Sequence, residues 1–149
     1  MKASLPKKQK GAAAIEFALV FVIFFATFYG VVSYSLPLLM MQSFNEASAE
    51  AARRSVALDP NAFANTAAYQ TQVTTTAKQA VSDQLAVWMP KALNFNISYV
   101  TATINPTTNV LTVAINYPKA GIANVIPFLT LPGIGQVPSL PDNLSAQSS

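Results

Sequence analysis

One carboxylate, Glu16, lies at the start of a long apolar run. Glu16 lies five residues after Gly11 in the segment GAAAIEFALV, and the next charged residue is Glu46. A charged side chain at the centre of a membrane helix costs about 2.5–3.5 kcal/mol, and less near the interface. A carboxylate in this position therefore needs a partner, and Glu16 is the first candidate for chemistry in the sequence.

Cleavage after Gly11 would create such a partner. Ala12 would become the first residue and Glu16 the fifth, and Ala12 would carry a free ammonium group. That ammonium on one subunit and Glu16 on a neighbour attract strongly in low dielectric, which offsets the burial of both charges and fixes the axial register of packed helices. This hypothesis predicts that Glu16→Ala prevents assembly, and unchanged assembly would count against it.

Both residues also have simpler interpretations. Gly11 is then a linker or helix-starting glycine, and Glu16 an interfacial carboxylate that reaches the headgroups or balances Lys10. We favour the functional interpretation because an ionisable residue within a membrane segment is by default a functional hypothesis.

Other routes to catalysis are few. The chain has no Cys and no His, which excludes a thiol nucleophile, an imidazole base, a disulfide and a Cys/His metal cluster. No G-x-S-x-G motif occurs, which leaves a lysine base as the remaining option. Glu46 and Glu50 share a helix face, but the nearby Arg53 and Arg54 favour ion pairs over an acid/base dyad. We predict no enzyme activity and no cofactor.

A long apolar run positions these residues. Of the 149 residues, 52% are hydrophobic and only 10% charged, and no charge occurs from Phe17 to Met41. As a helix this run spans roughly 37 Å, more than the ~30 Å hydrocarbon core of a bilayer. The sequence therefore predicts one tilted transmembrane helix.

The leader sets the orientation of this helix. Residues 1–11 hold four lysines and no acid, whereas the whole chain has a net charge of only +3. The positive-inside rule places the N-terminus in the cytoplasm and the chain after Met41 across the membrane. No aromatic or arginine-rich surface accompanies the lysines, so we predict no nucleic-acid partner. A cleavable signal peptide, cut near Ala47–Ala51, is the alternative, but its apolar region is typically only about 7–15 residues long.

The remainder predicts a small α+β domain. The Ala-rich stretch 42–58 continues the membrane helix. Asp59 before Pro60 is typical of an N-cap and predicts the start of a new helix, and a second helix is expected at about 66–89. Two β runs, 95–104 and 110–117, form an antiparallel hairpin. The first changes phase, which indicates a bulge or burial of both faces. Pro-rich residues 118–141 disfavour a regular helix or central strand, and 142–149 predict a frayed polar end.

The N-terminal pattern also resembles a known family. A basic leader, Gly11, four small or apolar residues, Glu16 and Phe17 resemble the prepilin-peptidase site of type IV pilins. Over about the first 58 residues, GAAAIEFALV, Tyr29-Gly30 and MQSFNEASAEAARRSVAL resemble the TadE-like minor pilins, or pseudopilins, of the tight-adherence (Tad, Flp) pilus.

The resemblance implies roles for these residues. Gly11 and Ala12 would flank the bond cut by a membrane aspartic prepilin peptidase, Glu16 would be the assembly glutamate, and Phe17 the aromatic residue after it. The chain would divide into a leader (1–11), a transmembrane and juxtamembrane helix (12–58) and an extracytoplasmic domain (59–149).

The resemblance also implies a function. The chain would be a minor pilin of the bacterial inner membrane that is incorporated in a surface pilus and supports adhesion and biofilm formation. Its partners would be other pilin subunits, contacted through the N-terminal helix, the prepilin peptidase, the inner-membrane assembly platform and membrane lipid. The alternative is an unprocessed, single-pass envelope or binding protein.

Overall fold

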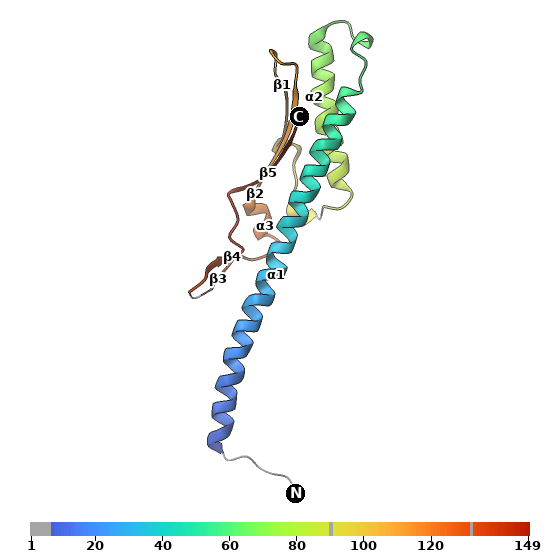
Figure 1. Cartoon of the computed structure of the whole chain (residues 1–149). Helices are drawn as coiled ribbons and strands as arrows, with labels where there is room; N and C mark the ends of the chain where they lie inside the picture. The colour runs from blue at the N-terminus through green and yellow to red at the C-terminus, as the bar shows by residue number, and fades with distance from the viewer. Residues whose placement is uncertain (1–6, 90, 132) are drawn as a thin grey trace.

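One long helix organises the molecule. The computed structural model describes residues 7–89, 91–131 and 133–149, with the side chains of residues 7–10 left out. Helix α1 (Lys7–Val56) runs as a single rod whose first half stands free, while its second half carries the rest of the chain (Figure 1). At 1.5 Å per residue, its 50 residues extend about 75 Å. The predicted α+β fold with a long N-terminal helix is confirmed.

The two halves of α1 differ in how they are covered. Every residue from Gly11 to Phe25 is exposed, whereas beyond Gly30 one stripe of the helix is buried. The stripe recurs every three or four residues, as one face of an α-helix does; it comprises Ser33, Pro37, Met40, Phe44, Ala47, Ser48, Ala51 and Ser55. The buried serine hydroxyls donate to carbonyls of their own helix, so none of these hydroxyls is buried without a hydrogen bond.

The second helix packs against this stripe. Helix α2 (Thr66–Ala86) returns alongside α1 (Figure 1) and buries Val73, Ala77, Ala80, Val81 and Leu85. Asp59 does act as an N-cap before Pro60, but of a short 3-10 turn, η1 (Pro60–Ala62). Helix α2 has its own cap, Asn65, whose side chain accepts the Ala68 N–H at 2.8 Å. The helix begins where we predicted and ends three residues before the predicted end at about 89.

The sheet has three antiparallel strands in the order β1 (Val100–Ile104), β2 (Leu111–Pro118), β5 (Asn143–Ser148). Central strand β2 buries Leu111, Val113, Ile115 and Tyr117, the face that the alternation predicts. The phase change before β1 has another cause than the two we considered. Two further 3-10 turns precede β1, η2 (Lys91–Leu93) and η3 (Ile97–Tyr99), so the strand begins only at Val100.

Our prediction of a frayed C-terminal end is wrong. Strand β5 pairs with β2 from Pro118 opposite Asn143 to Val113 opposite Ser148, and it buries Leu144 and Ala146. An ion pair between Lys119 Nζ and Asp142 Oδ1, 2.7 Å apart, joins the two ends of the segment that connects β2 to β5. The hydrogen bond from Lys119 holds the pKa of Asp142 below its usual value. The expected hairpin sheet therefore gains a third strand.

The Pro-rich segment contains only short elements, as predicted. They are α3 (Lys119–Ala123) and a separate two-stranded ribbon of β3 (Leu129–Leu131) and β4 (Gly135–Val137). Gly133 and Gly135 adopt positive φ in its turn, where glycine carries no Cβ penalty. Two hydrogen bonds tie the segment to α1. The Tyr29 hydroxyl donates to the Pro127 carbonyl, and the Ser139 N–H donates to the Tyr34 hydroxyl at 2.8 Å.

Tyr117 lies at the centre of the core. Its ring lies 5.9 Å from Phe44 of α1 and 5.6 Å from Tyr99, centroid to centroid, and its hydroxyl donates to the Leu93 carbonyl. Burial raises the pKa of this hydroxyl, and Tyr99 adds to the effect, so it remains a neutral donor. Gly121 of α3 leaves room for the ring, because a Cβ there would collide with it.

The assignment of β5 predicts that Leu144→Ala destabilises the domain. Leu144 is 2% exposed, so the truncation should lower the free energy of unfolding by about 2–4 kcal/mol. Gln147→Ala, on the exposed face of the same strand, should change it by less than about 0.5 kcal/mol. Urea unfolding of the full chain in detergent, followed by the fluorescence of Trp88, the only tryptophan, measures both. Equal stability of the two variants would mean that the end is frayed after all.

Candidate functional site

The free half of α1 is the first candidate surface. It is long and apolar enough to cross a membrane, and none of its most apolar window is buried by the protein. Phe17 and Ile23 are each 69% exposed. A contiguous apolar surface of this size marks a membrane or protein contact. This single long helix fits a single-pass membrane protein.

Aromatic rings line one side of this surface. Phe17, Phe21, Phe25 and Tyr29 follow one another at four-residue spacing, with ring centroids 6.0–6.1 Å apart. Side chains four residues apart on a helix are neighbours, so the rings stack into a ladder. The ladder ends at Tyr29, whose hydroxyl is bound to the Pro-rich segment. It thereby joins the membrane half to the domain, a connection that sequence reasoning missed.

The sequence-predicted site residues all lie on the uncovered half. Gly11 and Ala12 are inside α1, which begins at Lys7, and a Cβ added at Gly11 would meet nothing within 4 Å. Glu16 follows Ala12 by about one turn and is exposed, as is Phe17. No hydrogen bond or ion pair joins Glu16 to another side chain that the structure describes from residue 11 onward. Glu16 is therefore accessible to a partner outside the chain.

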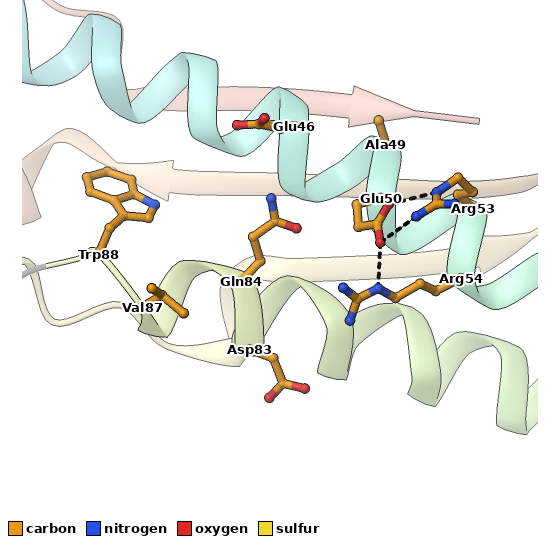
Figure 2. Close-up of a pocket in the computed structure, with 9 residues that line it drawn as sticks. All are labelled: Glu46, Ala49, Glu50, Arg53, Arg54, Asp83, Gln84, Val87 and Trp88. Atoms are coloured by element: carbon orange, nitrogen blue, oxygen red, sulfur yellow. Dashed lines mark hydrogen bonds and ion pairs between the residues drawn. The ribbon is translucent and has the colours of Figure 1, made fainter.

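A second candidate is a cleft of about 730 Å³ between α1 and α2. Figure 2 shows an arginine pair at one end of it and the Trp88 indole at the other. Glu50 accepts hydrogen bonds from Arg53 (Nε, 2.8 Å, and Nη2, 2.9 Å) and from Arg54 (Nε, 2.7 Å). Three charge-assisted bonds thus converge on one carboxylate. Among the described side chains, Trp88 Nε1 is buried without a hydrogen-bond partner.

The electrostatics of this cleft do not suit acid/base catalysis. The hydrogen bonds from Arg53 and Arg54 lower the pKa of Glu50 to about 2, so Glu50 is a bound anion at neutral pH. The Glu46 carboxylate lies apart from it (Figure 2). Asp83 accepts the Gln79 amide at 2.8 Å. The prediction of an ion-pair role is confirmed for Glu50. Within the described residues, no three His, Cys, Asp or Glu side chains group as a metal site.

Among the comparisons with known proteins, one match includes the first candidate surface. Residues 11–53 match a family model described as TadE-like protein. The match begins at Gly11, covers the free half of α1 and ends at Arg53, which is less than a third of the chain. No curated protein and no solved structure is significantly similar to the chain.

The cleft generates a pH prediction. The lowered pKa of Glu50 means that its ion pairs stabilise the folded state above about pH 4.5, the ordinary pKa, and that this contribution is lost as the pH falls towards about 2. Glu50→Gln should therefore lower Tm slightly at pH 7, and the difference from wild type should shrink between pH 4.5 and 2. Because Glu50 is largely solvent-screened, the effect is small.

The matched control is Glu46→Gln, which removes an exposed carboxylate of the same helix. It should leave Tm unchanged at both ends of the pH range. Thermal unfolding of the full chain in detergent, recorded in steps from pH 7 to 2.5, measures both variants. A Glu50→Gln difference that stays constant over this range would contradict the assigned ion pairs.

Proposed function

We propose, from the premise that residues 11–53 make this chain a TadE-like protein, that it is a minor pilin of a Tad-type pilus. The family match supports a pilin-like protein associated with this pilus system, and the family is a structural one. In the proposal, α1 holds the chain in the bacterial inner membrane, a prepilin peptidase removes residues 1–11, and the mature subunit joins the fibre. The observation that carries it is the wholly uncovered apolar half of α1, with Glu16 near its start.

The uncovered half of α1 is suited to the transfer of the subunit from lipid to a fibre during assembly. In the membrane, about 20 residues of helix face lipid. A subunit that leaves the membrane must exchange lipid for other apolar surface, because water cannot cover these side chains favourably. The helices of neighbouring subunits provide such a surface. Every residue from Gly11 to Phe25 is exposed, which leaves this part of α1 open to them.

Glu16 supplies a charge for register in this packing. Removal of the leader creates an ammonium at Ala12, and Glu16 on a neighbour is its complement in a low-dielectric surrounding. A helix displaced along the fibre axis leaves both charges unpaired, so the pair selects one axial position.

The local structure at Gly11 suits a peptidase substrate. A helical peptide bond must unwind to enter an active site, and glycine costs a helix about 1 kcal/mol relative to alanine. No side chain of the domain packs against Gly11, so unwinding there breaks no tertiary contact. The basic leader would stay on the cytoplasmic side during the cut.

Partners and consequences follow from the proposal. The subunit would contact other pilins through α1, the peptidase through its leader and the inner-membrane assembly platform before it enters the fibre. It would contribute to adhesion and biofilm formation as a part of the pilus. The alternative function, an unprocessed anchored envelope or binding protein, uses the same membrane helix and differs in retaining residues 1–11.

Leader removal distinguishes these functions. N-terminal sequencing and intact mass of the protein from native membranes should give a start at Ala12 in cells that have their prepilin peptidase. Cells without the peptidase should yield the full chain. An uncut chain in both strains would establish the anchored module instead. A start near Ala49–Ala52 would identify residues 1–48 as a signal peptide.

Assembly tests Glu16 separately from cleavage. Glu16→Gln keeps the shape of the side chain and removes its charge, so the Ala12 ammonium loses its partner. Loss of one member of a buried pair costs about 3–5 kcal/mol. We therefore expect the variant to be cut normally but to fall at least about tenfold in sheared pili, measured by immunoblotting. Glu46→Gln is the control, and wild-type incorporation of Glu16→Gln would refute the register role.

A further inference from the structure

A second part of the chain has the composition of a membrane contact. No charged residue occurs between Lys119 and Asp142, which pair with each other. Within this segment Ile134, at the turn of the β3–β4 hairpin, is 67% exposed, and Val125 is 41% exposed. Leu129 and Leu131 of β3 are half-buried. An uncharged segment that exposes apolar side chains is a candidate for contact with lipid or protein where it lies beside a larger apolar surface.

The hairpin is held at one level of α1. The Tyr29 bond to Pro127 fixes the chain before β3, and the Tyr34 bond to Ser139 fixes it after β4. Figure 1 shows the hairpin projecting sideways from α1 at the point where the free half of the helix begins. Its position is therefore set by the same helix that enters the membrane.

That level coincides with the edge of the bilayer. A hydrocarbon core of ~30 Å accommodates about 20 helical residues. Counted from Gly11, 20 residues end at Gly30, and counted from Phe17, the first residue after Glu16, they end at Leu36. For an upright helix the outer boundary thus falls between Gly30 and Leu36, beside the two tyrosines that hold the hairpin, and a tilt moves it towards Met41, where the charge-free run ends. Tyrosine is enriched at this interface.

We propose that the β3–β4 hairpin inserts its tip, with Ile134, into the outer leaflet of the membrane that α1 spans. The occupant is lipid because the hairpin is uncharged and continuous in space with the membrane half of α1. A two-stranded ribbon has unpaired backbone edges, which hydrocarbon does not tolerate, so the tip lies at the boundary of headgroups and acyl chains. The domain then touches the bilayer at two places, which fixes how it is rotated about α1.

The chain suits a site-specific test because it contains no cysteine. Single variants Ile134→Cys, Val31→Cys and Thr107→Cys accept an environment-sensitive NBD label. Val31 lies on the exposed membrane half of α1, and Thr107 lies in the β1–β2 turn at the far end of the domain (Figure 1). The full-length variants are reconstituted in phosphatidylethanolamine and phosphatidylglycerol vesicles, with or without acyl chains that carry bromine, which quenches the label on contact.

We expect bromolipid to quench the label at residue 134 at least about half as strongly as the label at residue 31, and to leave the label at residue 107 almost unaffected. Residue 134 behaving like residue 107 would overturn the proposal. Such a result together with oxidative cross-linking of Ile134→Cys chains would instead assign the tip to a contact between copies. All three positions are exposed, so Trp88-detected unfolding should match wild type and exclude misfolding as a cause.

The inference depends on the membrane span of α1 and not on leader cleavage or pilus assembly. Loss of quenching at residue 31 as well would overturn the anchor itself. Normal quenching at residues 31 and 134 in a chain that is never cut would retain this inference while the proposed function failed. The two conclusions are therefore separable.

Discussion

The structure depends on one constraint: a single helix must be stable in an apolar surrounding along its first half and within a water-soluble domain along its second half. The first half of α1 exposes apolar side chains on every side, which is stable only in lipid or against other helices. The second half buries a narrow stripe, and from Gln42 onward its exposed positions are mostly polar, as in the spine of a water-soluble domain. Because the helix is continuous through the change, the anchor and the domain core share one rigid element.

The domain is built to cover that stripe. Helix α2 packs on one flank, the three-stranded sheet packs on the other, and Phe44 of α1 meets Tyr117 of the central strand in the core. The same packing limits where partners are able to bind α1. Its own domain covers one side from Ser33 to Ser55, so a partner is able to surround α1 only along the uncovered half.

The distribution of charge follows the same division. Three acids of the domain have side-chain partners at its surface: Glu50 with two arginines, Asp83 with Gln79, and Asp142 with Lys119. Glu16 alone stands in the apolar half of the helix. An anion held by two arginines cannot exchange protons near neutral pH, whereas an uncovered carboxylate in an apolar surface is free to take up a cationic partner. This contrast is what leads us to propose Glu16, and not the cleft, as the functional carboxylate.

The sequence by itself determined the elements that rest on long or strictly periodic patterns. A charge-free run of 25 residues predicts the membrane helix, the alternation from Leu111 to Tyr117 predicts β2, and the spacing of Glu50 from Arg53 and Arg54 predicts their ion pairs. Each of these signals is local, because the interacting residues lie within one element. The Gly11–Glu16 pattern is equally local, because it lies within one helix.

Only the tertiary structure decided the C-terminal third. In NLSAQS only Leu144 and Ala146 are apolar, too weak a pattern to indicate a strand, and it becomes β5 because the open edge of β2 offers hydrogen bonds and a buried face. The position of the Pro-rich hairpin depends on Tyr29 and Tyr34, about a hundred residues away in sequence. Contacts of such separation leave no periodic trace in either partner, so folding alone brings them together.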